Sequence, residues 1–330
     1  MVENVETQLK KSDQRIQWVD IAKGIAILLM IIGHEIPGGS RLYALIFSFH
    51  MPLFFILSGY TSKKVANWNT FLSKTKKSFY RIWLLAIVMI VINTVLQFTF
   101  WGHFNLLEML VKGMVWGSNI PAKGIGNVGV MWFLIVFFWA KMLFSLLLMT
   151  MSEREIGICL LGLSFISYLI SSHFWLIQGW DIVPFAALFM WGGYVARNSY
   201  QLIQPTKWRY PFILVATILW AFLVLKNIHI ELAVRLYPFF IVSIIEAFAG
   251  AMICCLVAQK LVKIEIIRKI FEPIGKHTLA LLCIHHLDFY WITWDGLVNQ
   301  WYLAVFLRTA LDLVAFTVWL MLLHSVSSKN

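Results

Sequence analysis

The stretch WVDIAKGIAILLMIIGHE, residues 18–35, indicates a membrane protein because it is long and apolar enough to cross a bilayer as one helix. It carries Lys23 near its start and His34 near its end. At about 100° and 1.5 Å per residue, both lie on one helix face, roughly 16 Å apart along the axis. An ionisable side chain costs about 3 kcal/mol or more inside a bilayer, so both residues are candidates for function.

Similar apolar blocks recur along the chain. Hydrophobic residues make up 60% of the 330 positions and charged residues 13%, about half the share of a soluble domain. We therefore predict an all-α polytopic membrane protein with about ten transmembrane helices. The predicted spans are 19–37, 42–61, 80–100, 130–150, 156–174, 181–197, 211–227, 237–259, 277–294 and 302–324. Residues 1–15 form a polar cytoplasmic segment, 16–325 the membrane domain and 326–330 a cytoplasmic tail.

The lysines and arginines outside the spans predict the orientation. With both termini in the cytoplasm, the external loops hold only Arg41, Lys112, Lys123, Lys226 and Arg235. The net charge of +11 is thus explained by topology, and nucleic-acid binding is not expected. No small-residue cleavage site follows the first apolar block, which we interpret as a retained helix. The chain is expected to be a multi-pass protein of the cell (plasma or inner) membrane.

Two segments between spans stand out. Residues 62–79 are basic and predict an amphipathic cytoplasmic helix on the lipid surface. Residues 101–129 are predicted to be a long, glycine-bearing external loop, which either covers a site or is a slack connection.

Further histidines lie inside the predicted spans. His50 enters the second span at a depth close to that of His34, and His285 lies near the middle of the ninth span. Asp288 lies three residues after His285 on the same helix face, where it can orient the imidazole. We favour His285 over the adjacent His286 as the functional residue. The alternative for His50 is a cap on a kinked helix.

Four motifs carry a resemblance to a known family: WVDIAKGI (18–25) continuing to His34, FHMPLFFILSGY (49–60), MWFL (131–134) and IGKHTL (274–279) leading to His285. In order and spacing they resemble the acyltransferase 3 family, ten-helix membrane acyltransferases that include fucose 4-O-acetylase-like and nodulation-factor O-acetyltransferases. Many members have arginine where this chain has Lys23. Lysine keeps the charge but loses the bidentate fork.

The resemblance implies an O-acyltransferase, with acetyl as the expected group. Its donor would be cytoplasmic acyl-CoA, and its acceptor a hydroxyl of an extracytoplasmic or lipid-linked carbohydrate. Transfer from a thioester to an alcohol needs a base and stabilisation of an oxyanion. We expect His34 to be the general base, with Glu35 as its orienting group. His50 and His285 would line the pocket or stabilise the oxyanion.

The substrates are assigned by position. Lys23 and Arg81 are expected to bind acyl-CoA; the alternatives are a lysine that snorkels to the surface and a basic run that only sets topology. Trp132 is expected to stack on the sugar, with Asp288 nearby, although an interfacial anchor is the commoner use of tryptophan. No metal is expected.

Three other functions compete with acyl transfer. Intramembrane His, Lys and Asp also form proton relays, so a secondary transporter or channel for a small solute is the first alternative. It is disfavoured because the hydropathy shows no inverted repeat. A haem or metal protein and a scaffold without catalysis are the others. The sequence leaves open whether the acceptor is a cell-wall glycan, an exported polysaccharide, a lipid-linked sugar or a small molecule.

Overall fold

The computed structural model describes residues 16–102, 104–118, 127–199, 209–288 and 297–327. The described chain is mainly helical, with irregular connections between the helices and one isolated β-bridge between Glu231 and Leu236. Its main helices are α2 (Gln17–Gly33), α3 (Arg41–Phe47), α4 (His50–Tyr60), α5 (Trp68–Ser78), α6 (Leu84–Trp101), α7 (Leu106–Trp116), α8 (Trp132–Thr150), α9 (Glu153–Ser171), α10 (Val183–Ser199), α11 (Arg209–Leu225), α12 (Ile241–Leu261), α13 (Glu265–Lys276), α14 (Thr278–Asp288) and α16 (Trp301–Ser327). The predicted polar segment 1–15 lies outside the described residues.

Six helical stretches of the described chain are long and apolar enough to cross a membrane. They are Arg41–Tyr60, Trp68–Phe100, Gly129–Thr150, Glu153–Ser171, Ile241–Leu261 and Trp301–Val326. The other four predicted spans coincide with α2, α10, α11 and α14, which have 17 residues or fewer. The protein is therefore a multi-pass membrane protein. The number of ten spans and the cytoplasmic termini stay predictions.

The second predicted span is not one regular helix. The chain leaves α3 after Phe47, turns through Ser48 and Phe49, and starts α4 at His50. Pro52 occupies the first turn of α4, where a proline nitrogen replaces an N–H that has no partner within the helix. The break places His50 at the beginning of a helix, with its side chain next to the end of α2.

The long loop predicted at 101–129 contains a helix, so that prediction was wrong for residues 106–116. The α7 helix begins where the Asn105 side chain accepts a hydrogen bond from the Glu108 N–H, and it ends at Gly117 with φ +57°. In the basic segment, α5 begins at Trp68 and buries Phe71 while its lysines stay exposed. Its contact with a lipid surface remains a prediction.

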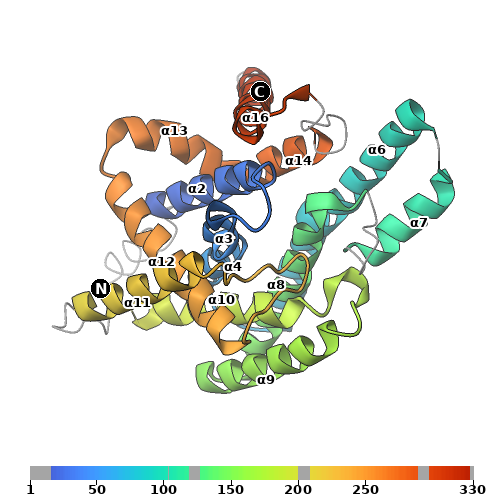
Figure 1. Ribbon diagram of the computed structural model, residues 1–330. Helices are drawn as coiled ribbons and strands as arrows, with labels where there is room; N and C mark the ends of the chain where they lie inside the picture. Colours follow the sequence, from blue (N-terminus) through green and yellow to red (C-terminus); the bar gives the residue numbers. More distant parts are fainter. Residues whose placement is uncertain (1–15, 103, 119–126, 200–208, 289–296, 328–330) are drawn as a thin grey trace.

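The α2 helix lies at the centre of the bundle (Figure 1) and contacts α3, α4, α12, α13, α14 and α16. Close backbone contacts at glycines allow this packing. A Cβ atom on Gly59 of α4 would lie 1.7 Å from the Met190 carbonyl oxygen of α10, and one on Gly193 would lie 1.9 Å from that of Ile56. The same holds for Gly275 of α13 against the Asp20 carbonyl of α2, at 1.7 Å. Small residues that bring helix backbones together are the usual means of packing in membranes.

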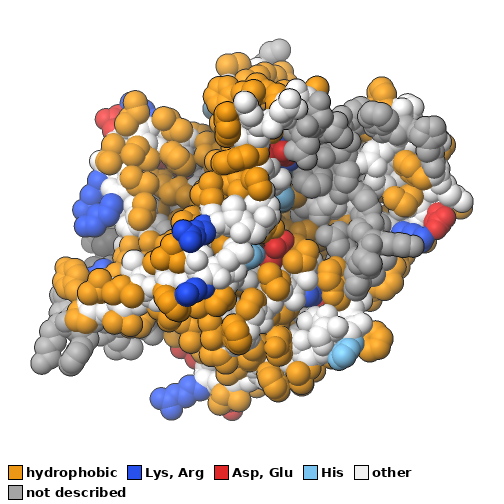
Figure 2. Space-filling view, in the orientation of Figure 1, with side chains coloured by type: hydrophobic (Ala, Val, Ile, Leu, Met, Phe, Trp, Pro, Cys, Tyr) orange, Lys and Arg blue, Asp and Glu red, His pale blue; other side chains and the backbone are white. Residues whose placement is uncertain are grey.

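The outer faces of the helices are apolar. Figure 2 shows hydrophobic side chains over most of one face, with few charged groups between them. Large exposed hydrophobic residues include Ile158 and Phe165 of α9, Phe212 and Val215 of α11, and Val314 of α16. This surface is suited to lipid contact.

The glycine contacts predict a stability difference. Replacing Gly59 or Gly193 by Ala should force α4 and α10 apart, and overpacking of this kind costs about 1–3 kcal/mol. We expect the midpoint of thermal unfolding in detergent to fall by about 5 °C, measured by fluorescence-detected size-exclusion chromatography. Gly162→Ala on α9 is the matched control, because a Cβ there meets nothing within 4 Å. Equal midpoints for all three variants would contradict the packing described.

Candidate active site

Three helices bring two histidines and a carboxylate into one hydrogen-bonded row. Nδ1 of His34, at the end of α2, lies 3.0 Å from Nε2 of His285 on α14. Nδ1 of His285 lies 2.8 Å from Oδ2 of Asp312 on α16. Asp312 and His285 are both fully buried. The bond between His285 and Asp312 is therefore shielded from solvent, and hydrogen bonds in such surroundings are strong.

The row determines which imidazole nitrogens carry protons. An ionised Asp312 only accepts, so His285 donates to it from Nδ1–H. Nε2 of His285 then accepts a hydrogen bond from Nδ1–H of His34. This arrangement puts the remaining lone pair of His34 on Nε2, as in a catalytic triad where an aspartate sets the tautomer of the base. His34 is thereby prepared to take up a proton at Nε2.

A second ion pair lies beside this row. Arg308 is one helical turn before Asp312 on α16, and its guanidinium donates to the carboxylate of Glu35, the residue after His34. Arg308 is 2% exposed, so the pair is formed within the protein. It ties α16 to the end of α2 and holds His34 against His285. Glu35, which the sequence predicts to orient His34, thus has an ionic partner, Arg308, that lies outside the sequence motif.

His50 lies on the other side of His34. Its Nδ1–H donates to the carbonyl oxygen of Ile46 at 2.8 Å, which leaves Nε2 as the second titratable atom. The Phe47 ring contacts both imidazoles edge-on, with centroid distances of 6.5 Å to His34 and 4.9 Å to His50. His34, His50 and Trp132 line one small cavity of about 40 Å³, which we call the histidine cavity. The other wall residues include Met30, Met51, Glu231 and Leu282.

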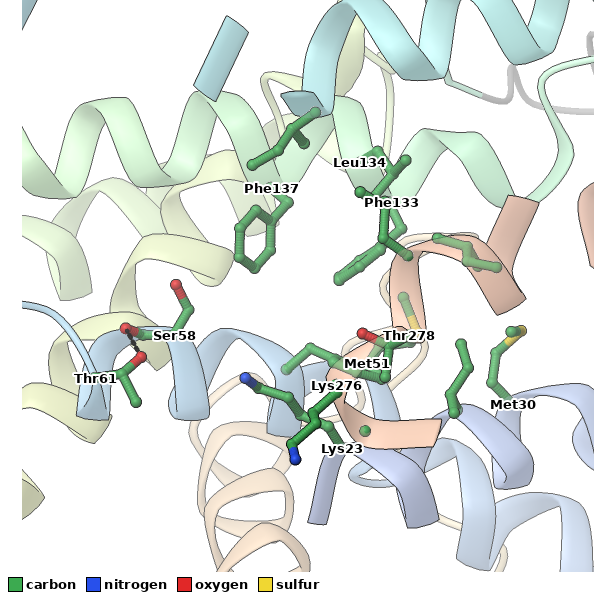
Figure 3. Close-up of a pocket in the computed structure, with 16 residues that line it drawn as sticks. Lys23, Met30, Met51, Ser58, Thr61, Phe133, Leu134, Phe137, Lys276 and Thr278 are labelled. Carbon is green, nitrogen blue, oxygen red and sulfur yellow. Dashed lines mark hydrogen bonds between the residues drawn. The ribbon is translucent and has the colours of Figure 1, made fainter. Parts of the chain in front are cut away.

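A larger cavity of about 270 Å³ adjoins it and shares Met30, Met51 and Leu282 as wall residues. In Figure 3, Phe133 and Phe137 lie on one side of this space, and Lys23 and Lys276 lie on the other. The amine of Lys23 is 3.9 Å from the Asp20 carboxylate, and its side chain is 29% exposed. Lys23 therefore lies at the adjoining cavity and not at the histidine cavity, and Met30 is a wall residue of both.

A third cavity, about 380 Å³ in volume, adjoins the second through Ser58 and Thr61. Four lysines line this basic cavity: Lys63, Lys74, Lys77 and Lys141. Arg81 is exposed and is not a wall residue, but it lies close enough to Lys141 for their charges to repel. Such a group of cations favours an anionic ligand.

A comparison with known families identifies the family of the chain. A family model described as "Acyltransferase domain", that of the acyltransferase 3 family, matches residues 16–326. The chain belongs to this family. It is thus a membrane acyltransferase, which requires an acyl donor and an acceptor. Searches of the curated proteins and of the solved structures found no significant match.

The expected site residues of this acyltransferase fall into three groups. His34 and His285 are bonded directly, and His34 shares its cavity with His50 and Trp132. Lys23 lies at the adjoining cavity and Arg81 beside the basic one. Asp288 ends α14, and its side chain lies outside the described residues. The carboxylate on Nδ1 of His285 belongs instead to Asp312.

Asp312, Arg308 and Lys141 were missed in the sequence. Each is a charged residue inside an apolar helix, so the rule that singled out Lys23 also applies to them. Among the described residues, no group of three or more His, Cys, Asp or Glu side chains has the arrangement of a metal site.

The hydrogen-bonded row predicts that Asp312→Asn lowers kcat for acyl transfer. Asparagine keeps the size of the side chain, but its amide no longer selects the Nδ1–H tautomer of His285, so His34 loses its orientation. We expect kcat for acyl transfer to fall by about 10²-fold or more, with the Kd for the acyl donor unchanged. Steady-state kinetics and calorimetry measure the two quantities.

The matched control is Thr317→Ala on the same helix, whose hydroxyl bonds only the Leu313 carbonyl. A kcat for Asp312→Asn within a factor of three of the control would show that the row does not serve catalysis.

Proposed function

We propose that this acyltransferase moves an acetyl group from cytoplasmic acetyl-CoA to a hydroxyl of an extracytoplasmic or lipid-linked carbohydrate. The proposal rests on the series of three adjoining cavities, which leads from the basic cavity to His34. One end attracts phosphates, and the other holds an oriented base. An acyl-CoA matches both ends, because its phosphorylated nucleotide is at one end of the molecule and its thioester is at the other.

The basic cavity supports CoA as the donor. Lys74, Lys77 and Arg81 all lie close to Lys141, which itself projects from the apolar helix α8. Bound phosphates would relieve the repulsion between these cations. The pantetheine arm would then pass between Phe133 and Phe137 on one side and Lys23 on the other, toward Met30 (Figure 3).

The charge distribution supports the direction of transfer. Lys63, Lys74 and Lys77 belong to the basic segment that the positive-inside rule assigns to the cytoplasm. His34 lies at the opposite end of α2 from Lys23, roughly 16 Å away along the axis. Acetyl-CoA would therefore enter from the cytoplasm, and its thioester would meet an acceptor that comes from the other side.

The histidine row supplies the chemistry. His34 would remove the hydroxyl proton at Nε2 while the acceptor oxygen attacks the thioester carbonyl carbon. The C–S bond then breaks, the new ester remains on the acceptor, and the proton passes from His34 to the CoA thiolate. Asp312 and His285 would stabilise the positive charge on His34 between these two transfers. His50 lies on the same cavity and, when protonated, could donate from Nε2 to the oxyanion.

The size of the histidine cavity supports acetyl as the acyl group. Its volume of about 40 Å³ corresponds to a few water molecules. An acetyl group fits such a space, whereas a succinyl group would bring its free carboxylate against the apolar side chains of Met30 and Met51.

His34→Ala is expected to abolish transfer. The variant should insert, fold and bind acetyl-CoA normally, because the substitution removes only the base. Purified protein in lipid nanodiscs with radiolabelled acetyl-CoA would measure the transfer, and mass spectrometry would detect acetyl groups on surface glycans of cells that carry each variant. His324→Ala is the control, since His324 is exposed and bonds only its own helix at Leu320. Full activity of His34→Ala would remove the proposed mechanism.

Lys141→Met tests the donor site. We expect it to raise KM for acetyl-CoA about 10-fold, the effect of losing about 1.4 kcal/mol from one charge-assisted phosphate contact. KM for acetyl-pantetheine, which has no phosphates, should not change. Lys260→Met removes the same charge from an exposed position on α12 and should change neither constant. Equal increases for both donors would contradict phosphate binding at Lys141.

A further inference from the structure

The segment between α11 and α12 forms part of the wall of the histidine cavity. It contributes Glu231, Leu232 and Ala233, and the chemistry described above uses none of them. We propose that Glu231, with Tyr43 and His229, forms the acceptor-binding site and selects an uncharged, hydroxyl-rich acceptor over an anionic one. This inference rests on the proposed function, because it assigns the second substrate of the same reaction.

The backbone around Glu231 is held firmly although it belongs to no helix. Glu231 and Leu236 exchange two backbone hydrogen bonds of 2.9 Å, which close a short turn. Arg235, within this turn, donates to both carboxylate oxygens of Asp181 at 2.6 and 3.2 Å, and its guanidinium lies 4.1 Å from the centre of the Trp175 ring. A further bond from Arg235 holds the carbonyl of Ala233 at 2.9 Å. Glu231 is thus presented to the cavity by a fixed support.

The Glu231 side chain is the acidic group on this wall. It is 15% exposed, so a ligand in the cavity can reach it. Its carboxylate lies 3.9 Å from Nε2 of His229 and close to the Tyr43 side chain. The Tyr43 ring contacts His229 edge-on at 5.6 Å and stacks on Phe47 at 3.8 Å. Since Phe47 also contacts His34 and His50, the three residues are continuous with the proposed base.

This arrangement fits a neutral polyol. A carboxylate accepts hydrogen bonds from two neighbouring hydroxyl groups at once, and aromatic rings such as Trp132 and Tyr43 can cover the apolar face of a sugar ring. Because the histidine cavity is only about 40 Å³, the reacting hydroxyl would enter it while the sugar ring stays outside, beside Glu231. Among the described residues that line the histidine cavity, none is a lysine or an arginine. An acceptor with its own carboxylate or phosphate would therefore meet Glu231 without a compensating cation, and repulsion in this poorly solvated space would exclude it.

The experiment uses full-length protein in nanodiscs with acetyl-CoA and matched pairs of acceptors. Each pair is a neutral methyl glycoside (gluco, galacto or manno) and the corresponding methyl glycuronide, which differ only at C6. The ratio of kcat/KM for the neutral over the acidic member should be at least 10 for the wild type. In Glu231→Gln, which keeps size and a hydrogen-bond acceptor, the ratio should fall by 10-fold or more, mainly through a lower KM for the acidic member.

Two further variants separate recognition from structural support. Tyr43→Phe keeps the carboxylate, so it should raise KM for the neutral glycosides severalfold without changing the ratio. Glu108→Gln removes an exposed carboxylate of α7 that pairs with Lys112, and it should change neither quantity. If Glu231→Gln does not fold, the unchanged ratio of Tyr43→Phe with a raised KM still supports the site, and an unchanged KM overturns it.

The outcomes also separate this inference from the proposed function. Calorimetry of acetyl-CoA binding to the wild-type protein comes first. If acetyl-CoA does not bind, the donor assignment and the acceptor site are both wrong. If acetyl-CoA binds, three results overturn the acceptor site alone. They are an unchanged ratio in Glu231→Gln, a wild-type preference for glycuronides, and acetylation of no neutral glycoside in the set.

Discussion

The hydrogen-bonded row from His34 through His285 to Asp312 is the interaction on which the rest of the site depends. A buried carboxylate and two imidazoles in a membrane protein are tolerable only if they satisfy one another, since neither lipid nor bulk water can do so. The row joins α2, near the start of the chain, to α14 and α16, near its end. Any packing of these helices that separated the three side chains would leave polar groups unpaired at a cost of several kcal/mol. The requirement of catalysis and the requirement of stability thus act on the same contacts.

The central position of α2 follows from small residues and has a direct consequence for the site. Gly275 allows α13 to approach the backbone of α2, and Gly59 and Gly193 do the same for α4 and α10. With its neighbours so close, α2 has Lys23 at one adjoining cavity and His34 at another. One helix therefore connects the region assigned to the donor with the region assigned to the chemistry. The two ends of the reaction path are aligned by the geometry of a single rigid element.

The wall that we propose for acceptor binding is built from irregular chain. Helices supply His34, His285 and Asp312, the residues of the proposed chemistry, and packed helices hold side chains in fixed positions. The wall toward the acceptor contains Glu231 on a turn whose shape is set by the Arg235–Asp181 ion pair. Turns vary more easily than packed helices, so relatives with the same chemistry can differ in acceptor through such a segment.

Much of the molecule could be predicted from local patterns. Apolar blocks marked the helices because a bilayer imposes a minimum length, and charges inside these blocks marked His34, Lys23 and His285. The break before His50 was predicted only as the alternative of a kinked helix, because hydropathy is the same on both sides of it. The α7 helix was not predicted, because the glycines of this segment suggested a loop, although Asn105 and Gly117 are ordinary helix boundaries.

The amino-acid sequence alone predicts that the chain is a helical membrane protein, shows its resemblance to the acyltransferase 3 family, and indicates which intramembrane histidines are candidates. Those properties are local, since they depend on the length, polarity and order of short segments. The tertiary structure was needed to show that Asp312 is the carboxylate hydrogen-bonded to His285, that Arg308 pairs with Glu35, and that Lys141 lines the basic cavity. Partners such as these are set by the packing of helices distant in sequence, and the spacing of residues along one helix carries no information about it.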